Sequence, residues 1–495
     1  MSSFDDPATT PVLPRRHFPI WGWLSIGTLI IAVACVVWFV VVPWINTSTS
    51  QPVTPDSRSA PVWGPVVDVT QGLQPAQPGQ YYFVDYTLVS GDLILASISL
   101  SDLRAGTGTI GLYLRAIDAQ ASKIIWTLDM ASIGVPPKSN YQLDMDSSSG
   151  MAILIWVTGD LCYLISIRIS DGTVMARSST GLPCPEPFSP GYQFFTINAV
   201  DGTAMVSILM AAAESDPTKY AYYGFEESDL DHPVWQHRAS SFAYVVGDRW
   251  VCADGCWSLA DGSDASFGAD ARSAPDGSGV RYFSFQDVNG KFRIYRFTNS
   301  SSSFNFQQWS TSNDKPMPGT KAVTWSSAQW SYLNSSLKWM YTPPNGNAHT
   351  LLLCEASACT PVSMDGNVTY PSFPFDGYPS GIEFNETLLV SGYDSNGRTN
   401  SQLVSLSSGQ MTEIGPYDGC VAPNDLAYCR FGKNGSPVPM KFQAIDPAKG
   451  AVPVWSSQPD QMPDSDGYHA QIGETASTLF CYDYVLYRFQ FASRY

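Results

Sequence analysis

Acidic and hydroxyl side chains alternate in one short stretch of this 495-residue chain, Asp-Met-Asp-Ser-Ser-Ser-Gly at residues 144–150. Hard oxygen ligands at alternate positions, here Asp144, Asp146 and Ser148, could wrap a Ca²⁺ ion. Gly150, however, falls one position later than a calcium loop requires, and the apolar run that follows has no bidentate Glu. The pattern therefore favours a turn between two strands over a calcium site.

Two further motifs fit metal or phosphate chemistry poorly. His232 and His237 are five residues apart, so they would face opposite sides of a regular strand and make a poor pair of ligands for one metal ion. Gly106, Gly108 and Gly111 satisfy the pattern G-x-G-x-x-G, but a strand follows this loop where a dinucleotide site needs a helix. The sequence contains no H-E-x-x-H, G-x-S-x-G or Walker pattern. We therefore predict no catalytic residue and no metal ligand.

Aromatic side chains are abundant, with 15 Trp, 25 Tyr and 24 Phe. Four of them alternate with other residues within segment 326–341: Trp330, Tyr332, Trp339 and Tyr341. On an exposed face such rings could stack on sugars or on peptide side chains, which makes these four the candidate partner-binding residues. The same spacing is typical of a strand that faces a core, and this second interpretation is the favoured one.

The ten cysteines suggest a set of short disulfides. Proximity along the chain pairs Cys252 with Cys256, Cys354 with Cys359, Cys420 with Cys429 and, over a longer interval, Cys162 with Cys184, leaving Cys35 and Cys481. Short loops closed across tight turns are typical of an oxidising, extracellular environment. Each bridge would close a small loop and add less than the ~3 kcal/mol expected for a 15-residue loop.

The formal net charge of −17 arises entirely from residue 56 onward, because residues 1–17 balance and residues 18–55 carry no charged side chain. An acidic surface repels phosphate backbones, so we expect no nucleic-acid partner. Cationic partners and divalent ions remain compatible with it, but a solvated acidic exterior accounts for the charge without any partner.

Residues 20–44 form an uncharged apolar run with Trp near both ends. As a helix the run would reach roughly 35 Å, enough to cross a bilayer core of about 30 Å. Arg15 and Arg16 precede it, and the positive-inside rule then places the N-terminus in the cytoplasm. A cleaved signal peptide fits less well because the run is too long. A lipoprotein start at Cys35 fits less well because apolar residues continue directly after it.

These features predict a cytoplasmic tail over 1–18, a transmembrane helix over 19–44, a Ser/Thr/Pro-rich stalk over 45–61 and an extracellular domain over 62–495. The expected localisation is a bacterial plasma membrane, single-pass, with the N-terminus cytoplasmic and the C-terminal domain extracellular. Within that domain, alternating apolar runs are cut by Gly, Asp, Asn and Ser, as in an all-β fold with turn signals roughly every 8–12 residues.

One phrase recurs far apart in the chain, as "AIDAQASKIIW" at 116–126 and "AIDPAKGAVPVW" at 444–455. Weaker copies lie between them, giving eight anchors from Trp126 to Trp455 at intervals of about 47 residues, the spacing of propeller blades. We therefore predict an all-β fold, a single β-propeller of seven or eight four-stranded blades, preceded by one N-terminal transmembrane helix. Each copy would be the outer hairpin of a blade, and strands 81–90 and 478–489 would close the ring.

The phrase resembles the repeat of the pyrroloquinoline-quinone-type (PQQ-like) β-propeller family, whose blades carry "AlDaxTGxxxW". Ala116, Ile117, Asp118, Ala119 and Trp126 match it in the first copy, and the second copy matches at Ala444, Ile445, Asp446, Lys449, Gly450 and Trp455. In that family the Asp and Gly shape the turn, and the Trp packs between neighbouring blades. The resemblance extends over roughly 62–495 but is sharp only in these two copies.

Some members of that family are quinone-dependent alcohol or glucose dehydrogenases, and others are non-catalytic, such as propellers that scaffold outer-membrane protein assembly. The dehydrogenases use a disulfide between adjacent cysteines, and no adjacent pair occurs in this chain. We therefore expect a single-pass membrane protein that presents its propeller as a binding or scaffolding module for envelope protein or glycan partners. The alternative is a membrane-tethered quinone-dependent dehydrogenase or glycan-acting enzyme. No cofactor is predicted, and PQQ and Ca²⁺ are the groups left open.

Overall fold

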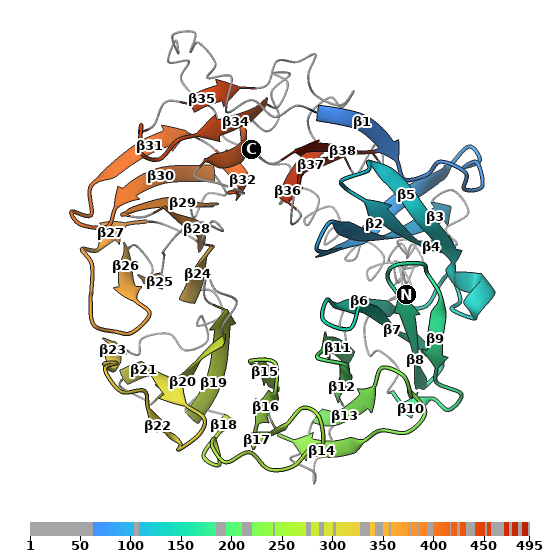
Figure 1. Cartoon of the computed structure of the whole chain (residues 1–495), viewed down its shortest axis with the longest axis horizontal. Coiled ribbons are helices and arrows are strands. Elements are labelled where there is room, and N and C mark those ends of the chain that lie inside the picture. Colours follow the sequence, from blue (N-terminus) through green and yellow to red (C-terminus); the bar gives the residue numbers. More distant parts are fainter. Residues whose placement is uncertain are drawn as a thin grey trace, which may run out of the picture.

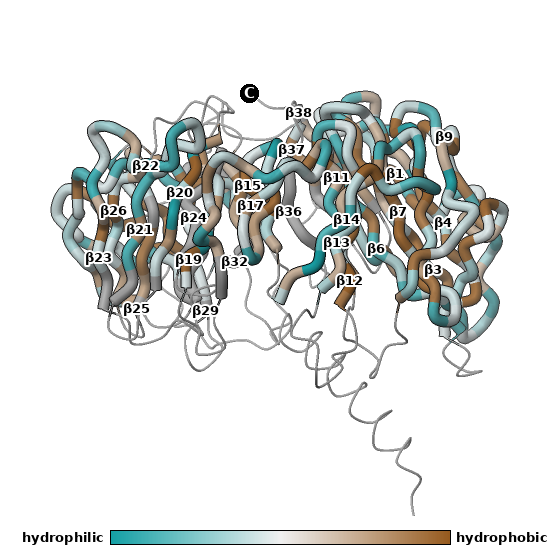
Figure 2. Tube along the Cα trace, turned by 90° about the horizontal axis from the view of Figure 1, so that it is seen from below, coloured by the Kyte–Doolittle hydropathy of each residue, from teal (hydrophilic) through white to brown (hydrophobic). Residues whose placement is uncertain are grey.

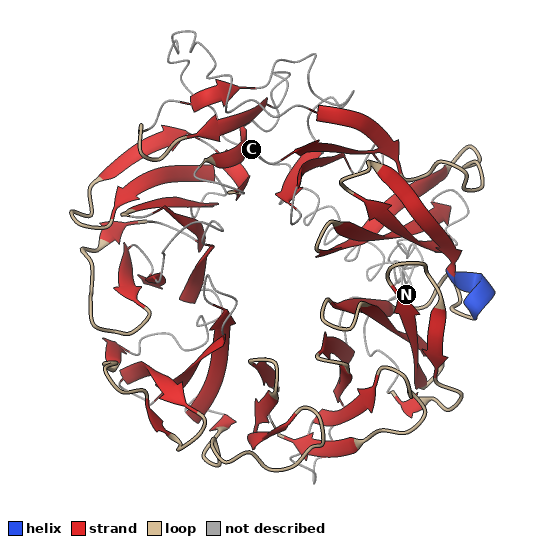
Figure 3. Cartoon of the chain, in the orientation of Figure 1, coloured by secondary structure: helices blue, strands red, loops and turns tan. Residues whose placement is uncertain are grey.

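The strands form small sheets that are arranged in a ring, and the innermost strands of these sheets face a common centre (Figure 1). The computed structural model describes residues 63–493 except 103–107, 185–194, 210–219, 241–242, 274–278, 287–291, 300–302, 327–336, 342–349, 356–357, 376–377, 385, 394–398, 416, 423–425, 432–440, 451–452, 457–469, 475–477 and 484–487. Within these residues the only helix is the four-residue 3-10 turn Met130–Ile133, and strands account for the rest of the regular structure (Figure 3).

The first blade shows how local sequence produces the repeated unit. It contains β2 (Gln80–Ser90), β3 (Leu93–Asp102), β4 (Gly108–Asp118) and β5 (Lys123–Asp129), hydrogen-bonded in that order from the ring centre outward. Ser90 pairs with Leu93, so Gly91 and Asp92 form a two-residue hairpin turn, and Gly91 has a φ of 58°. Gly is favoured where such a turn needs positive φ.

The next three blades follow the same plan with shorter strands. Blade two has β6 (Tyr141–Asp146), β7 (Met151–Thr158) and β8 (Leu161–Arg168), and both β9 (Val174–Arg177) and β10 (Leu182–Pro183) pair with β8. Blade three has β11 (Phe195–Val200), β12 (Thr203–Leu209), β13 (Tyr220–Glu226) and β14 (Trp235–Ala239). Blade four has β15 (Tyr244–Val246), β16 (Trp250–Ala253) and β17 (Gly255–Ser258). Blade four is the smallest among the described residues, since its three strands hold three or four residues each.

Five further blades complete the ring. Blade five has β18 (Arg272–Ser273), β19 (Gly279–Gln286), β20 (Phe292–Asn299), β21 (Ser303–Ser310), β22 (Lys315–Pro316) and β23 (Val323–Ser326). Blade six has β24 (Leu337–Tyr341), β25 (Thr350–Glu355), β26 (Ala358–Ser363) and β27 (Phe373–Pro374), and blade seven has β28 (Tyr378–Phe384), β29 (Thr387–Tyr393), β30 (Thr399–Ser405) and β31 (Met411–Gly415). Blade eight has β32 (Tyr417–Val421), β33 (Ala427–Phe431), β34 (Lys441–Ile445) and β35 (Pro453–Ser456), and blade nine has β36 (Ala470–Glu474), β37 (Thr478–Asp483), β38 (Arg488–Ser493) and β1 (Trp63–Asp68). Parallel pairing of β24 with β28 joins blades six and seven edge to edge.

The all-β propeller predicted from the sequence is confirmed, but the predicted blade number is wrong. The described residues form nine blades, not seven or eight. The eight phrases counted along the sequence fall in the first eight blades. Blade nine takes its outermost strand, β1, from the first described residues, 63–68, so it has no outer hairpin and carries no copy of the phrase.

Ring closure joins the two ends of the described chain in one blade. β1 pairs antiparallel with β38, and the side-chain amide of Gln490 donates to the carbonyl of Gly64 at 2.8 Å. The closing strand is therefore Trp63–Asp68, whereas we predicted 81–90, which is β2 of the first blade. A buried Arg115 on β4 then ties the following linker down by donating to the carbonyls of Val69 (2.6 Å) and Gln71 (2.7 Å).

The apolar cores lie between blades. One core cluster, for example, combines Leu95 and Leu112 of blade one with Leu154 and Ile165 of blade two, all at most 1% exposed. In side view the apolar residues follow the strands through the thickness of the ring (Figure 2). A single blade cannot bury both of its faces, so each blade depends on its two neighbours.

Among the residues that the structure describes, none forms a helix with the length and apolar character needed to cross a membrane. The predicted transmembrane helix, 19–44, lies outside those residues, as do the predicted tail 1–18 and stalk 45–61. The predicted single-pass plasma-membrane localisation is therefore not upheld and is withdrawn.

Candidate functional site

The innermost strand of blade one carries exposed aromatic side chains. Tyr81 is 50% exposed and Phe83 is 41% exposed. They stand directly opposite Ser101 and Ser99 of β3, so these side chains share one side of the blade. We call Tyr81, Phe83 and the neighbouring Asp85 the β2 surface.

A β-bulge places Asp85 at the end of this surface. Val84 pairs with Ile98 and Tyr86 pairs with Ser97, which leaves Asp85 as the extra residue on β2. A bulge re-aims the side chain of the inserted residue. The carboxylate of Asp85 consequently points toward blade two and reaches the hydroxyl of Tyr141 on β6.

Two hydroxyl groups donate to the carboxylate of Asp85, and a third orients one of the two. Tyr141 donates to Oδ2 at 2.7 Å, and Ser99 donates to Oδ1 at 3.0 Å. The hydroxyls of Ser97 and Tyr141 are 2.6 Å apart. Because the single proton of Tyr141 goes to Asp85, Ser97 is the donor in that contact. Tyr86 packs edge-on against Tyr141, with ring centroids 5.6 Å apart, and the four polar groups join blades one and two.

Electrostatics keep Tyr141 protonated in this network. Burial raises the pKa of Asp85, and the hydrogen bonds from Tyr141 and Ser99 oppose that rise. Burial, followed by the nearby charge of Asp85, raises the pKa of Tyr141. Tyr141 therefore remains a hydrogen-bond donor at neutral pH. The arrangement presents a pre-oriented carboxylate beside two exposed rings, which is chemistry for binding a ligand.

The aromatic residues predicted from the sequence lie elsewhere. Trp330 and Tyr332 are outside the described residues, and Trp339 and Tyr341 lie on β24, the innermost strand of blade six. Trp339 pairs with Leu351 and Tyr341 with Ile382, and the two positions share a face of the strand. Their role as partner-binding residues stays a prediction.

Sequence reasoning missed the β2 surface. The segment "QYYFVDYTLVS" reads as an ordinary alternating strand, and we assigned its apolar residues to ring closure. The only local signal is an Asp in the middle of an aromatic run. The bulge that exploits this Asp depends on the register with β3 and on Tyr141, 56 residues away.

Asp144 and Asp146 join two blades. Residues 147–150 form the turn between β6 and β7, as predicted. Asp144 Oδ2 accepts from the N–H of Ala199 at 2.8 Å, and Asp146 Oδ2 accepts from the N–H of Gly202 at 2.7 Å, both in blade three. Asp146 Oδ1 also accepts from Ser148.

This donor set does not fit Ca²⁺, because backbone and hydroxyl protons point at the oxygens that a calcium ion would need. Among the described residues, no group of three or more His, Cys, Asp or Glu side chains is placed to hold a metal ion.

A buried carboxyl group adjoins this junction. Glu227 is 5% exposed, and its Oε1 has no hydrogen-bond partner within the described residues. Burial raises its pKa to about 7, a hydrogen bond with Ser149 opposes the rise, and the charge of Asp146 adds to it. At Asp146 burial pushes the pKa up, but the N–H of Gly202 and the Ser148 groups outweigh it and hold the pKa below its ordinary value.

The two histidines have separate structural environments. His232 is exposed in the loop before β14, with Nδ1 3.1 Å from a carboxylate oxygen of Asp229. His237 lies on β14, where Nε2 is 2.8 Å from the carbonyl oxygen of Gly262 and the ring stacks on Trp257 at 4.6 Å. Of the glycine motif, Gly106 is outside the described residues, and Gly108 and Gly111 belong to β4, so the predicted hairpin interpretation agrees with the fold.

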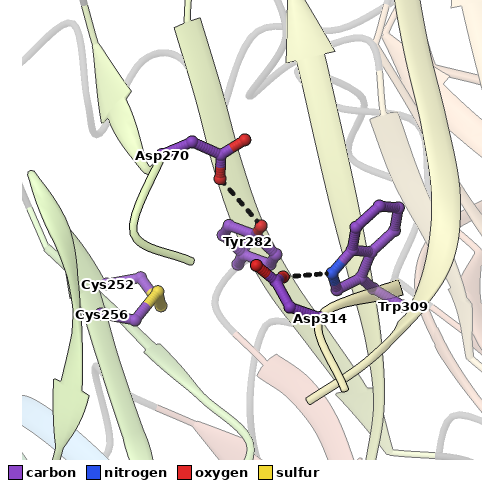
Figure 4. Close-up of a disulfide and its surroundings, with 6 residues drawn as sticks. All are labelled: Cys252, Cys256, Asp270, Tyr282, Trp309 and Asp314. Atoms are coloured by element: carbon purple, nitrogen blue, oxygen red, sulfur yellow. Dashed lines mark hydrogen bonds between the residues drawn. A yellow bond between two sulfur atoms is a disulfide. The ribbon is translucent and has the colours of Figure 1, made fainter. Parts of the chain in front are cut away.

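All four predicted disulfides form: Cys162–Cys184, Cys252–Cys256, Cys354–Cys359 and Cys420–Cys429. Three of them join directly opposed residues of a hairpin. Cys252–Cys256 links the short strands β16 and β17 and packs into the core shared with blade five (Figure 4). Nearby, Tyr282 donates to Asp270 at 3.1 Å and the indole N–H of Trp309 donates to Asp314 at 2.8 Å.

The Trp that ends the repeated phrase fastens one blade to the next. The indole N–H of Trp126 on β5 donates to the carbonyl of Ile169 in blade two at 2.7 Å. Trp235 on β14 likewise donates to Leu259 of blade four at 2.6 Å. In each case a Gly three residues after that carbonyl, Gly172 or Gly262, lies against the ring.

This chain is similar in fold to solved structures of β-propellers. BamB from Moraxella catarrhalis has 9% identity and a TM-score of 0.40, covering 88% of this chain and 98% of that chain. The WD40 domain of SCAP from fission yeast has 10% identity and a TM-score of 0.38, covering 87% and 98%. The β-propeller domain of the Trilobed protease from Pyrococcus furiosus has 7% identity and a TM-score of 0.34, covering 79% and 100%.

No family model and no curated protein sequence matches this chain. The similarities to solved structures are too distant to carry a functional argument.

Proposed function

We propose that this chain is a PQQ-like β-propeller that acts as a binding or scaffolding module and holds a protein or glycan partner at the β2 surface. The observation that carries this proposal is the exposure of Tyr81 and Phe83 beside the fixed carboxylate of Asp85. Exposed aromatic rings next to a convergent polar group are typical of binding surfaces, because the rings supply contact area and the polar group supplies orientation.

The PQQ-like assignment is supported by what the repeated Trp does. The family resemblance implies that this residue packs between neighbouring blades. Trp126 and Trp235 each donate to a turn of the following blade and each lie against a turn Gly there. The same contact at two separate junctions supports a common repeat, although the residues around it differ.

The network around Asp85 supports binding. Its two hydroxyl partners, Ser99 and Tyr141, hold the carboxylate in one orientation, and Ser97 orients Tyr141. A group held in this way loses little conformational freedom when a ligand binds, and such preorganisation favours affinity. Acid–base hydrolysis of glycans generally uses a pair of carboxyl groups, and the β2 surface presents one.

The experiment screens the full-length chain against defined glycan and peptide arrays. Wild-type protein is expected to bind a subset of one array, and the double variant Tyr81→Ala/Phe83→Ala is expected to lose at least tenfold in affinity for it. The control Val174→Ala/Met175→Ala removes exposed apolar side chains from β9, an outer strand of blade two, and is expected to bind as wild type does. Absence of any specific ligand, or equal binding by the two double variants, would overturn the proposal.

A further inference from the structure

We propose that the partner at the β2 surface is a basic protein segment, in which the cationic group of a Lys or Arg side chain pairs with Asp85 while the segment lies against Phe83 and Tyr81. This inference rests on the proposed function and narrows the partner from protein or glycan to a basic protein segment. It is carried by the hydrogen bonding of Asp85, the position of the two rings and the charge of the chain.

The first step concerns how the hydroxyl protons are used. Ser99 and Tyr141 both donate to Asp85, and Ser97 donates to Tyr141. None of these three protons therefore remains for the ring oxygen or hydroxyl oxygens of a sugar. At Asp85 the ligand has to bring the donors itself, and a carboxylate with two hydrogen bonds still has free lone pairs to accept them.

The second step concerns the rings. Tyr81 and Phe83 are two residues apart on the same strand and share the side of the blade that holds Ser99, so they lie about 7 Å from each other along β2. Both have large exposed fractions, 50% and 41%. The face of an aromatic ring attracts a cation, such as the guanidinium group of Arg or the ammonium group of Lys. A carboxylate and aromatic faces together favour a cation over a neutral hydroxyl.

The third step concerns the whole surface. The chain carries 44 acidic and 27 basic side chains, for a net charge of −17. Such a field raises the local concentration of positively charged partners and repels anionic ones. A basic protein segment is therefore complementary both to Asp85 and to the chain around it. Acidic glycans and phosphorylated ligands are disfavoured on the same ground.

The test measures fluorescence anisotropy of fluorescein-labelled (Gly-Lys)₄ with the full-length chain at 50 mM and 300 mM salt. The comparison probes are (Gly-Gln)₄, (Gly-Glu)₄ and a neutral labelled maltohexaose. We expect (Gly-Lys)₄ to bind, with at least a tenfold loss in Asp85→Asn and in Tyr81→Ala/Phe83→Ala. Asn keeps an oxygen that accepts from Tyr141 or Ser99, so Asp85→Asn is expected to remain folded, which its thermal unfolding curve checks.

A matched control separates a specific site from general attraction. Asp201 is exposed in a turn at a φ of 48°, where Asn is equally suitable, so Asp201→Asn removes the same charge far along the chain. It is expected to weaken (Gly-Lys)₄ binding less than twofold. Equal losses in Asp85→Asn and Asp201→Asn would overturn the inference, because binding would then reflect net charge alone.

The outcomes for the inference and for the proposed function differ. Binding of maltohexaose that depends on Tyr81 and Phe83, without binding of (Gly-Lys)₄, would overturn the cationic partner and leave the proposed binding function standing. No binding of either probe, together with empty glycan and peptide arrays, would overturn both.

Discussion

At the residue scale, a few positions decide how tightly neighbouring blades hold together. Gly172 is the clearest of them, because a Cβ at this position would lie 2.8 Å from two ring carbons of Trp126, and its φ is 73°. Glycine is therefore favoured at position 172 for two separate reasons: the ring of Trp126 approaches too closely for a side chain, and the backbone φ is positive.

A comparison of two glycines separates those reasons. Gly150 has a φ of 70°, but a Cβ there would meet nothing within 4 Å. We expect Gly150→Ala to lower the free energy of unfolding by about 1–2 kcal/mol through backbone strain alone. Gly172→Ala is expected to lose about 1–3 kcal/mol more, because the methyl group must displace Trp126. Urea unfolding of both variants measures the difference, and equal losses would show that the ring moves aside freely.

Glu227 gives a pH dependence whose sign follows from its environment. Burial raises its pKa from 4.5 to about 7 in the folded chain, so the folded state binds the proton more tightly than the unfolded state does. The resulting stabilisation is full below pH 4.5 and disappears as the pH rises to about 7.

We expect the free energy of unfolding of the wild type to decline over that interval relative to the variant Glu227→Gln, which stays neutral. Urea unfolding at pH 4.5, 6 and 8 provides the measurement. A constant difference between the two proteins across the series would contradict a titrating Glu227.

At the element scale, the hairpin is the unit that the sequence describes best. The phrases ending at Trp126 and Trp455 fall on β4–β5 and β34–β35, the outer hairpins of blades one and eight, as predicted. The hairpin disulfides were also predictable, because cysteines four or five residues apart across a turn are opposed in an antiparallel pair. Local spacing determines these features.

Contacts between elements were not predictable from the same spacing. The cross-blade hydrogen bonds of Asp144 and Asp146 reach residues 55 and 56 positions away, and Asp85 depends on Tyr141 at a similar distance in sequence. Such pairs are set by how blades pack, not by local periodicity. The candidate site therefore had to come from the structure, whereas the blade architecture came largely from the sequence.

The disulfides should differ in their contribution to stability according to the loop that each closes. Cys162 and Cys184 are 22 residues apart, and Cys252 and Cys256 are four apart. From loop-closure entropy we expect Cys162→Ala/Cys184→Ala to lose about 1.5 kcal/mol more than Cys252→Ala/Cys256→Ala. All four side chains are at most 5% exposed, so the lost packing is similar. The midpoints of urea unfolding test this order, and a larger loss for the four-residue bridge would refute it.

At the scale of the whole molecule, closure depends on β1. This six-residue strand covers blade nine and shares a core cluster with Phe489 and Phe491 of β38 and with blade one. The sequence did not predict the ninth blade, because β1 is separated along the chain from β36, β37 and β38, the other strands of that blade, by about 400 residues. A closed ring leaves each blade flanked on both sides, which an open arc cannot do.

Adjacent residues of β1 provide a test of closure. Val67 is 6% exposed in that core cluster, and Val66 is 44% exposed. We expect Val67→Asp to lower the free energy of unfolding by about 3 kcal/mol or more, because an unpaired charge would be buried. Val66→Asp is expected to change it by less than about 0.5 kcal/mol. Thermal and urea unfolding distinguish them, and similar values for the two variants would mean that β1 contributes little to closure.

The pairing of β1 with β38 also sets an order of events during synthesis. β1 ends at Asp68 and its partner begins at Arg488, so about 420 residues leave the ribosome after β1 before β38 appears. At bacterial or eukaryotic rates of about 5–20 residues per second, that interval lasts roughly 20 to 80 seconds. During that interval β1 has no partner and the apolar side of blade one that packs on blade nine stays uncovered, so the nascent chain exposes aggregation-prone surface until β38 is made.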